Sequence, residues 1–291
     1  MNSLNKKSHA WITGHTGFIG QELTKNLKHN FEIFRISRND ILEKNKFFKR
    51  KIHINEIKIN NLKKFNKNFL FHLATYYEPK HKSIVDINNI IDSNLLFGLR
   101  ILNTMGYKFF SKILLTQSYL ELLNKKQMTL YAKTKSIFAN EVEKKLPKKV
   151  IKTYLYDTFG LSDSREKLVN IWLKKLILNK PLTIYSKNTV VNLSSREFIS
   201  KVISKIKLIK PGSYEIRSEV EMKLIELVDF LKEITKSKSN IIIKNDKPVK
   251  IIKKYDNLSK ILNIEYNENN FKEDICKILN NEKNYKKNKK N

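Results

Sequence analysis

Apolar and polar positions along the chain form two kinds of pattern in turn. Short apolar runs predict strands at His9–Thr13, Phe31–Ile36, Phe69–Ala74, Lys112–Leu115, Lys149–Leu155 and Pro181–Tyr185, with a less defined strand near 52–54. Amphipathic stretches predict helices at 18–28, 84–105, 131–142 and before residue 178. Beyond residue 207 the pattern weakens, although helices are still indicated near 222–234 and 271–279.

Glycine recurs at every third position between the first strand and the first helix, at Gly14, Gly17 and Gly20. Gly14 lets the chain turn sharply, Gly17 lets backbone N–H groups approach a pyrophosphate, and Gly20 lets the helix lie close to the sheet. The helix that opens at Phe18 and Ile19 offers N–H donors and a positive dipole end. Such a turn also occurs in ordinary loops, but its place between a strand and a helix favours a dinucleotide site.

The end of the second strand bears on the choice of cofactor. An acidic residue there binds the 2′-hydroxyl of NAD, whereas a small residue followed by arginine accommodates the 2′-phosphate of NADP. This strand ends at Ser37 and Arg38, and the next acidic residue, Asp40, lies two positions further on. The sequence therefore predicts NADP(H), with NAD(H) as the alternative. A solvated loop arginine is the other interpretation of Arg38.

Tyr131 and Lys135 are four residues apart in a predicted helix and so share one face. A free phenol has a pKa near 10, and an ammonium one turn away favours the phenolate and lowers that pKa. Tyrosine can then exchange a proton with a carbonyl oxygen near neutral pH. Ser118, at the end of the preceding strand, can polarise the same oxygen. We expect these three residues to be catalytic.

The glycine turn, Ser118 and the Tyr131-x-x-x-Lys135 spacing together resemble the extended branch of the short-chain dehydrogenase/reductase superfamily. The resemblance implies an α/β fold: a Rossmann-type doubly wound parallel sheet with a smaller C-terminal α/β substrate-binding lobe. It implies an NAD(P)-binding domain over 1–156, a partly interleaved lobe over 157–281 and a basic disordered tail over 282–291. In the family, Lys135 would also hold the nicotinamide ribose.

Two further residues, Ala74 and Asn94, take expectations from this resemblance. The phrase His72-Leu73-Ala74 is similar to a strand that brings the backbone after Ala74 beside the cofactor. His72 itself is interpreted as a satisfied core histidine rather than a catalytic base. Asn94 interrupts an apolar helical stripe, and the family uses an asparagine there to support the catalytic lysine through a water. A helix-packing asparagine is the alternative.

The run from Leu155 to Gly160, followed by Arg165 and Lys167, resembles the CDP-abequose and CDP-paratose synthase group. That group reduces a 4-keto-6-deoxyhexose, which implies deoxysugar biosynthesis for a surface polysaccharide such as lipopolysaccharide. Arg165, aided by Lys167, is then expected to bind the diphosphate of a nucleotide-linked sugar, and Asp157 is expected in the same substrate site. Solvated cations at a helix start are the alternative. A short loop after Ser118 and the stretch 194–197 depart from the family pattern.

Other activities compete with this NADPH-dependent reductase. A dehydratase would need an Asp-Glu pair after Thr116, where Gln117 and Ser118 stand instead, which argues strongly against dehydration. A nucleotide-sugar 4-epimerase using bound NAD is the second choice. A non-catalytic dinucleotide- or RNA-binding protein on the same fold is supported only by the net charge of +30.

Composition narrows the remaining choices. The lysines are scattered from end to end of the 291 residues, so no nucleic-acid partner is expected. A basic surface would still attract a small anionic substrate such as a nucleotide. No apolar run is long enough to span a bilayer, and no signal peptide is visible, so a cytoplasmic enzyme without membrane insertion is expected. A single cysteine, Cys276, excludes an internal disulfide, and no metal is expected. The resemblance also implies a homodimer through the helices at 84–105 and 131–146.

Overall fold

The structure, a computed structural model, describes residues 7–37, 50–53, 67–78, 83–123, 128–161, 163, 165, 167–249 and 251–288, of which 50–53 and 282–288 are described by their backbone alone. The chain divides into two compact units. Unit 1 comprises Met1–Tyr154, Ser200–Glu215 and Lys254–Asp256. Unit 2 comprises Leu155–Ile199, Ile216–Lys253 and Asn257–Asn291. Both units are thus built from separate stretches of chain, and each is described by itself.

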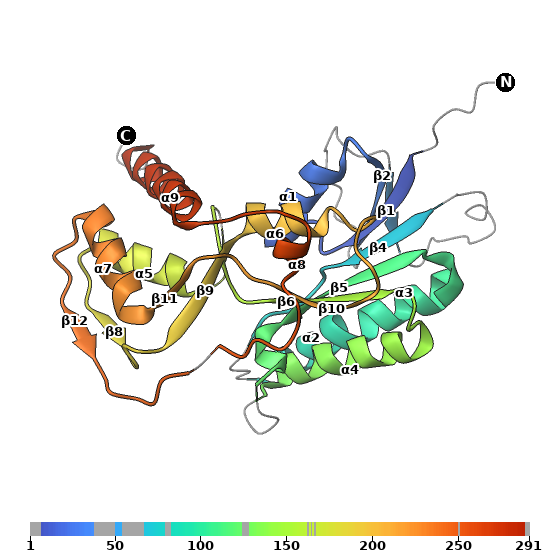
Figure 1. Cartoon of the computed structure of the whole chain (residues 1–291), viewed down its shortest axis with the longest axis horizontal. Coiled ribbons are helices and arrows are strands. Elements are labelled where there is room, and N and C mark those ends of the chain that lie inside the picture. The colour runs from blue at the N-terminus through green and yellow to red at the C-terminus, as the bar shows by residue number, and fades with distance from the viewer. Residues whose placement is uncertain are drawn as a thin grey trace. The chain divides into compact units, whose positions relative to one another are not determined.

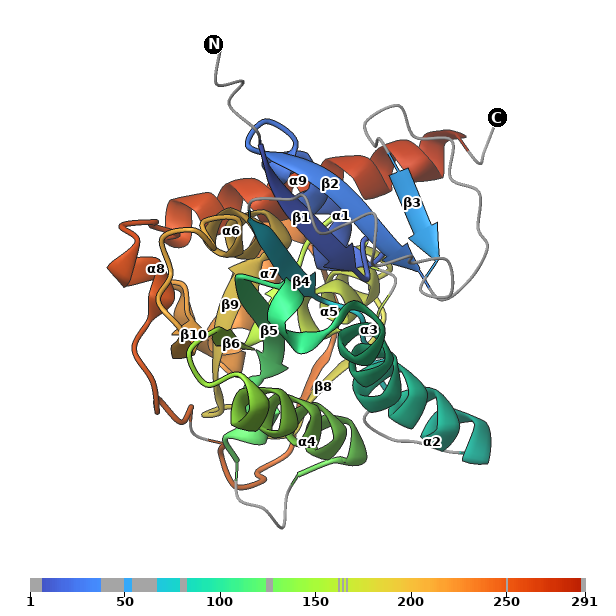
Figure 2. The same cartoon turned by 90° about the vertical axis from the view of Figure 1, so that its right-hand side faces the viewer.

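Unit 1 is organised around a seven-stranded sheet (Figures 1 and 2). Its strands lie side by side in the order β10 (Gly212–Ile216), β6 (Val150–Leu155), β5 (Lys112–Ser118), β4 (Asn68–His72), β1 (Ser8–Thr13), β2 (Phe31–Ser37) and β3 (Arg50–His53). The pairs β1–β2, β1–β4, β2–β3 and β4–β5 are parallel. The order reverses between β1 and β4, which is where sheets of this kind bind ligands. The predicted Rossmann-type doubly wound sheet is confirmed.

Helices cover both faces of this sheet. They are α1 (Phe18–Leu27), α2 (Ile84–Ile91), α3 (Phe97–Met105) and α4 (Leu130–Lys145), with short turns η3 (Asp92–Leu96), η4 (Tyr107–Phe109) and η5 (Tyr119–Glu121). Figure 1 shows α1 on the opposite side of the sheet from α3 and α4. The helix α6 (Arg196–Ile203) begins in unit 2 and ends in unit 1.

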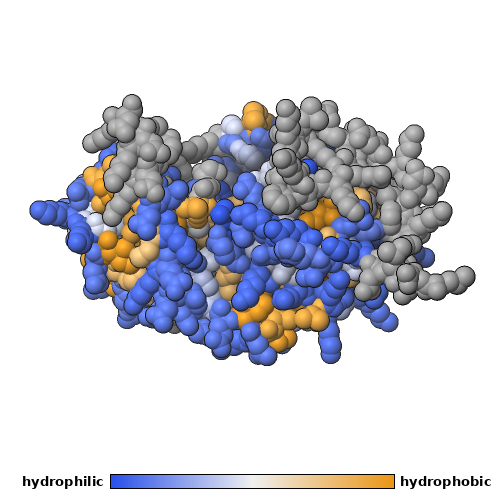
Figure 3. All heavy atoms as spheres, turned by 90° about the horizontal axis from the view of Figure 1, so that it is seen from above, coloured by the Kyte–Doolittle hydropathy of each residue, from blue (hydrophilic) through white to orange (hydrophobic). Residues whose placement is uncertain are grey.

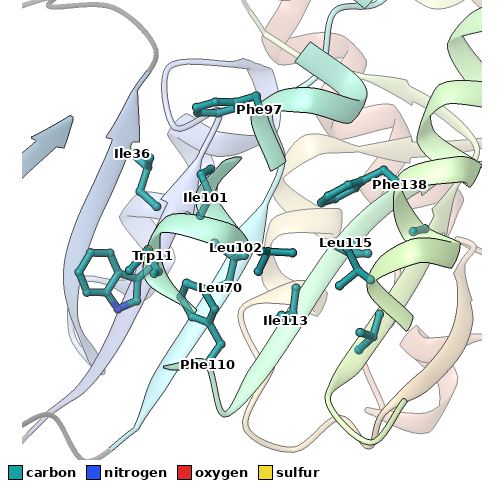
Figure 4. Close-up of a cluster of buried hydrophobic side chains, with 14 of the residues drawn as sticks. Trp11, Ile36, Leu70, Phe97, Ile101, Leu102, Phe110, Ile113, Leu115 and Phe138 are labelled. Atoms are coloured by element: carbon teal, nitrogen blue, oxygen red, sulfur yellow. The ribbon is translucent and has the colours of Figure 1, made fainter. Parts of the chain in front are cut away.

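One hydrophobic cluster of unit 1 lies between the sheet and the helices α3 and α4. Figure 4 shows Phe97 and Phe138 pointing from these two helices toward the strands. The indole of Trp11 stacks on Phe34 at 4.4 Å between ring centroids, and its Nε1–H donates to Asn68 Oδ1 at 2.9 Å. The buried indole thus gains both apolar contact and a partner for its N–H.

The region predicted as one helix over 84–105 differs from that prediction. A π-helical turn, η3, separates α2 from α3, and both Ser93 and Asn94 are buried within it. Such turns insert an extra residue into a helix and are frequent at functional sites. The insertion turns the Asn94 amide toward groups outside the helix, which an apolar stripe could not reveal.

Unit 2 contains two small sheets and a helical layer. The strands β7 (Asp157–Phe159), β9 (Val190–Ser195) and β11 (Glu221–Lys223) form one sheet, and β8 (Leu182–Ile184) pairs with β12 (Ile241–Ile243). The helices are α5 (Leu168–Ile177), α7 (Leu224–Thr235), α8 (Leu258–Ile261) and α9 (Glu268–Asn288). In the core of unit 2, the centroid of the Phe271 ring lies 5.3 Å from the ring centroid of Phe159 and 5.3 Å from that of Phe230.

The C-terminal helix corrects one expectation. The backbone of residues 282–288, predicted as part of a disordered tail, continues α9 to Asn288. Phe271, Ile275 and Leu279 bury the first half of this helix. Once such a half is docked, each added residue extends the helix at little cost.

Hydrophilic side chains predominate on the face drawn in Figure 3, with scattered apolar patches among them. In the parts of the chain that the structure describes, no helix is both long and apolar enough to cross a membrane.

Candidate active site

The glycine turn joins the end of β1 to the start of α1. Gly14 has a φ of +65°, and a Cβ there would lie 2.7 Å from the backbone nitrogen of Ala74. A Cβ on Gly20 would overlap the backbone of Gly14 and His15. Gly17 donates its N–H to the Gly14 carbonyl at 3.0 Å, and its added Cβ would meet only that oxygen, at 3.1 Å. The space on the Cβ side of Gly17 is therefore bounded by a single backbone oxygen.

This turn fits the pyrophosphate of a nicotinamide dinucleotide. Gly17 caps α1 without a side-chain hydrogen bond, and the first turn, which holds Phe18 and Ile19, contains no acidic residue. An uncapped helix N-terminus next to a bare backbone is suited to binding phosphate oxygens. Ser37 is the last residue of β2, as the predicted ribose site requires. Arg38 lies outside the described residues.

Thr13 and His72 fasten β1 to β4 beside this turn. Thr13 Oγ1 accepts from the N–H groups of Leu73 and Ala74, each at 3.1 Å, and contacts His72 Nδ1 at 3.1 Å. The hydroxyl hydrogen then goes to Nδ1, which assigns the ring proton to Nε2. Burial, and secondarily the charge of Lys135, lowers the pKa of His72 to about 3. His72 is thus neutral at neutral pH and serves the core.

The helix α4 carries Tyr131 and Lys135 on its buried face, where they are 8% and 6% exposed. Thr129 caps the helix by accepting from Ala132 N at 3.3 Å. Lys135 Nζ lies 5.8 Å from the centroid of the Tyr131 ring, and Tyr77 packs edge-on against that ring at 5.1 Å. Burial lowers the pKa of Lys135, and the charge of Glu121 opposes that shift. The spacing read from the sequence thus brings a phenol and an ammonium together.

Ser118 ends β5 and caps the turn η5. Its Oγ accepts from Leu120 N at 3.3 Å, and its N–H donates to Glu121 Oε1 at 2.8 Å. With the Gln117 amide oriented to satisfy its neighbours, that amide donates to the two Glu121 oxygens at 3.0 and 2.7 Å. Burial raises the pKa of Glu121, against the charge of Lys135 and the Ser118 hydrogen bond.

Sequence reasoning missed Glu121. The available signal was a serine followed three residues later by glutamate, which is the pattern of a capping box. That pattern predicts the backbone contact with Ser118. It could not predict that Lys135, on the different helix α4, adds its charge to the surroundings of the Glu121 carboxylate.

Asn94 holds the segment that follows β4. Its Oδ1 accepts from Thr75 Oγ1 at 2.9 Å and from Tyr76 N at 2.8 Å. Its Nδ2 donates to Tyr76 O at 3.2 Å and to Thr134 Oγ1 at 3.4 Å. Asn94 therefore links the post-β4 segment to the residue preceding Lys135. These contacts reach beyond the helix that carries Asn94, and its support of Lys135 stays a prediction.

In unit 2, a cluster forms around Asp157, Arg165 and Lys167. Arg165 donates from Nε and Nη2 to the two oxygens of Asp163 at 2.7 and 2.8 Å, and from Nη2 to Thr158 Oγ1 at 3.0 Å. Burial raises the pKa of Asp157 to about 6, and burial followed by Arg165 lowers the pKa of Lys167 to about 8. The structure brings the predicted residues together. However, the two guanidinium nitrogens that could grip a phosphate donate to Asp163, a residue that the sequence had not singled out.

Comparison with known proteins decides the family. The sequence matches the model of the "NAD dependent epimerase/dehydratase family" over residues 10–218. The chain belongs to this family. A search of curated proteins gives no match.

Solved structures share the fold of this family member at low identity. UDP-N-acetylglucosamine 4-epimerase from Methanobrevibacter ruminantium has a TM-score of 0.70 and 14% identity, covering 92% of this chain and 96% of that one. UDP-glucose 4-epimerase from Thermus thermophilus, in complex with NAD, gives 0.64 and 13%, covering 84% and 90%. UDP-N-acetylglucosamine 4-epimerase from Bacillus cereus gives 0.67 and 16%, covering 90% and 92%. At these identities the likeness establishes the fold alone.

Membership of the family confirms the predicted NAD(P)-dependent enzyme of the extended short-chain dehydrogenase type. It also supports a nicotinamide dinucleotide as the cofactor. Among the described residues, no three His, Cys, Asp or Glu side chains gather where they could hold a metal ion.

Proposed function

We propose that this enzyme is a nucleotide-sugar 4-epimerase that oxidises and re-reduces one sugar carbon with a bound nicotinamide dinucleotide. The observation that carries the proposal is the buried face of α4, on which Lys135 Nζ lies 5.8 Å from the Tyr131 ring centroid, together with Ser118 at the end of β5. The names of the similar structures, which are 4-epimerases, support this choice over the reductase that the sequence favoured.

The residues of unit 1 supply proton exchange and orientation, while the dinucleotide accepts and returns the hydride. Tyr131 takes the hydroxyl proton of the sugar as the alcohol becomes a ketone and gives it back on reduction. The ammonium of Lys135 favours the phenolate form that starts this exchange. Ser118 Oγ accepts from Leu120 N, so its own hydrogen can be donated to the sugar oxygen.

A second candidate is an NADPH-dependent reductase of a nucleotide-linked 4-keto-6-deoxy sugar. Ser37 at the end of β2, followed by Arg38, favours it, because neither residue is the acidic partner that NAD prefers. The same three catalytic groups serve both reactions. The two candidates differ in whether the cofactor is retained or consumed.

The substrate anchors are also proposed. Asp157, Arg165 and Lys167 lie together in unit 2, and Lys167 caps the N-terminus of α5. Cations at that position are favoured when an anion offsets their repulsion by the helix dipole. We assign Arg165 and Lys167 to the diphosphate of the sugar nucleotide, with Arg165 held in place by Asp163.

A homodimer through α2 and α4 stays a prediction. Ile84 and Val85 on α2 and Ile137 on α4 are exposed apolar side chains on helices that pack against each other. Sedimentation of the wild type beside a triple Ser variant of these residues tests the assembly. A monomeric wild type contradicts it.

One experiment separates the two reactions. The nucleotide released from the purified protein is identified, and the protein is then incubated with UDP-sugars alone or with CDP- and dTDP-4-keto-6-deoxy sugars plus NADPH. An epimerase interconverts UDP-sugars with no net change in NADPH absorbance. A reductase consumes one NADPH for each sugar. Turnover of none of these substrates contradicts both proposals.

The cofactor preference is tested separately with Arg38→Ala. If Arg38 meets a 2′-phosphate, NADPH binding weakens by roughly 1–3 kcal/mol, and NADH binding is unchanged. Calorimetry that gives equal changes for both nucleotides removes Arg38 from the cofactor site and leaves NAD as the expected cofactor.

A further inference from the structure

The carboxylate of Glu121 is held from two sides at the end of β5. Ser118 N–H donates to Oε1 at 2.8 Å, and the Gln117 amide contacts both oxygens at 3.0 and 2.7 Å. Gln117 is 3% exposed, so this is not a solvated surface contact. Glu121 itself is half-buried, and a carboxylate that is partly removed from water needs such donors and a positive charge as well.

Two lysines supply positive charge around Glu121, one from α4 and one from β6. Lys152 pairs with Glu143 at 2.6 Å and so has its own carboxylate. For Lys135, which is 6% exposed, Glu121 is the one described group whose charge favours the ammonium form. His72 faces Lys135 from β4 and is neutral, so it supplies no negative charge.

Two phenols complete the surroundings. Tyr154 of β6 stacks on Tyr255 at 5.1 Å, and burial, followed by the neighbouring Tyr255, raises the pKa of Tyr154. Tyr154 therefore stays protonated and uncharged near neutral pH. Tyr131 faces Lys135 from the preceding turn of α4. The charged members of the group are Glu121, Lys135, Lys152 and Glu143.

We propose that Glu121 is a positioning residue of the active site, which fixes the backbone of Ser118 and acts as the counter-ion of Lys135. The inference rests on the proposed alcohol–ketone chemistry for its consequence, but not for its geometry. Glu121 thus acts on Ser118 and on Lys135, whose ammonium lies beside the Tyr131 ring, without itself touching the substrate.

The direction of the effect follows from burial. Burial lowers the pKa of Lys135, and the Glu121 charge opposes that shift. Removing the charge therefore lowers the pKa of Lys135 further, so that more of the lysine is neutral at a given pH. A neutral lysine no longer favours the phenolate of Tyr131, and turnover falls at neutral and higher pH.

Three variants separate charge from backbone contact. Glu121→Gln keeps an oxygen for Ser118 N–H but loses the charge, and Glu121→Leu loses both. Glu143→Gln is the matched control, because it removes the same charge from the neighbouring Lys152 pair. In addition, Glu121→Asp restores the charge and tests rescue.

The first readout is the titration of Lys135 by NMR of ¹³C-lysine-labelled protein, without substrate or cofactor, assigned with Lys135→Met. We expect Glu121→Gln to lower the titration midpoint by about one pH unit, the scale of one nearby opposite charge. Glu143→Gln should leave the midpoint unchanged, and Glu121→Asp should restore it. Should Glu121→Gln fail to fold, the wild-type Lys135 signal decides, since it must show a second step as Glu121 titrates.

An unchanged midpoint in Glu121→Gln, or a single step in the wild type, overturns the proposal whatever the substrate is. A shifted midpoint supports it. If the midpoint shifts but the wild type turns over no sugar nucleotide, the counter-ion role stands and the proposed function fails. If the enzyme is active, the alkaline pH at which kcat falls should be lower in Glu121→Gln than in the wild type, while KM changes little.

Discussion

The glycine turn of unit 1 and the cation cluster of unit 2 were both predicted as ligand-binding sites, and they differ in what builds them. The turn is made of backbone, with Gly14 in a left-handed conformation and Gly17 next to an uncapped helix. The cluster is made of charged side chains, and Arg165 is engaged with Asp163 and Thr158. A backbone site follows from the spacing of residues, whereas a side-chain site depends on which partners the fold brings to each charge.

The two sites also differ in what holds their residues in place. In the turn, a Cβ on Gly20 overlaps backbone atoms that cannot move aside, so the residue is fixed by packing. In the cluster, Asp163 is fully buried at its side chain, so Arg165 is fixed by the need to neutralise it.

The largest effect is expected at Gly20. Gly20→Ala places its Cβ against the Gly14 carbonyl, and overpacking of this kind costs about 1–3 kcal/mol or more. Gly17→Ala meets only one atom at 3.1 Å, so this variant should fold and lose dinucleotide affinity instead. Thermal unfolding and dinucleotide titration of both variants check this. Equal melting temperatures would remove the distinction between packing and ligand approach.

Tyr131→Phe keeps the ring but removes the phenol. Turnover of the sugar nucleotide should fall at least about 10²-fold, as for a lost acid–base group, while dinucleotide affinity changes little. Tyr107→Phe is the control, because Tyr107 contacts Lys145 away from this face. Steady-state kinetics with the identified substrate provides the measurement. A Tyr131→Phe enzyme with near wild-type turnover contradicts the assignment.

Arg165→Ala should affect stability as well as binding. It leaves buried Asp163 without its cation, which costs about 1.5–3 kcal/mol for charged hydrogen bonds. The Asp163→Ala/Arg165→Ala double variant should recover part of the stability but not the affinity for the sugar nucleotide. Urea unfolding and KM at saturating cofactor separate the two roles. If KM is unchanged in both variants, the cluster is structural.

The smallest effect concerns His72 and pH. Its pKa is about 3 in the folded state against about 6.5 unfolded, so the unfolded state binds the proton first as pH falls. Stability should fall below pH 6.5 by about 1 kcal/mol per pH unit relative to His72→Gln. Urea unfolding of both proteins on either side of that pH measures the difference. Parallel loss in the two proteins would show that His72 is not the buried neutral group.

The sequence predicted the fold and the backbone turn because both depend on local patterns. The strands around Ile12 and Ile33 and the helix after Gly17 lie where periodicity put them. The sequence also predicted that Tyr131 and Lys135 lie together, since residues four positions apart on a helix share a face. Each of these inferences needs only geometry within one element or between consecutive ones.

Inferences that depend on long-range partners were beyond the sequence. The π-helical turn at Asn94 is set by hydrogen bonds to Thr75 and Tyr76, eighteen or nineteen residues away along the chain. The environment of Glu121 depends on Lys135, which lies on another helix. Asp163 accepts from the guanidinium of Arg165, which was expected to bind phosphate. Propensity and spacing describe a residue's own element and cannot rank such partners.

The central claim is that the glycine turn and the Tyr131–Lys135 face belong to one nicotinamide site. Titration of NADH and NADPH, followed by nicotinamide fluorescence, tests it in wild type, Gly17→Ala and Lys135→Met, with Lys145→Met as control. The account predicts that both site variants stay folded and bind the preferred dinucleotide at least about tenfold more weakly, since a hydrogen bond to a charged group contributes about 1.5–3 kcal/mol. Wild-type affinity in either site variant would contradict it.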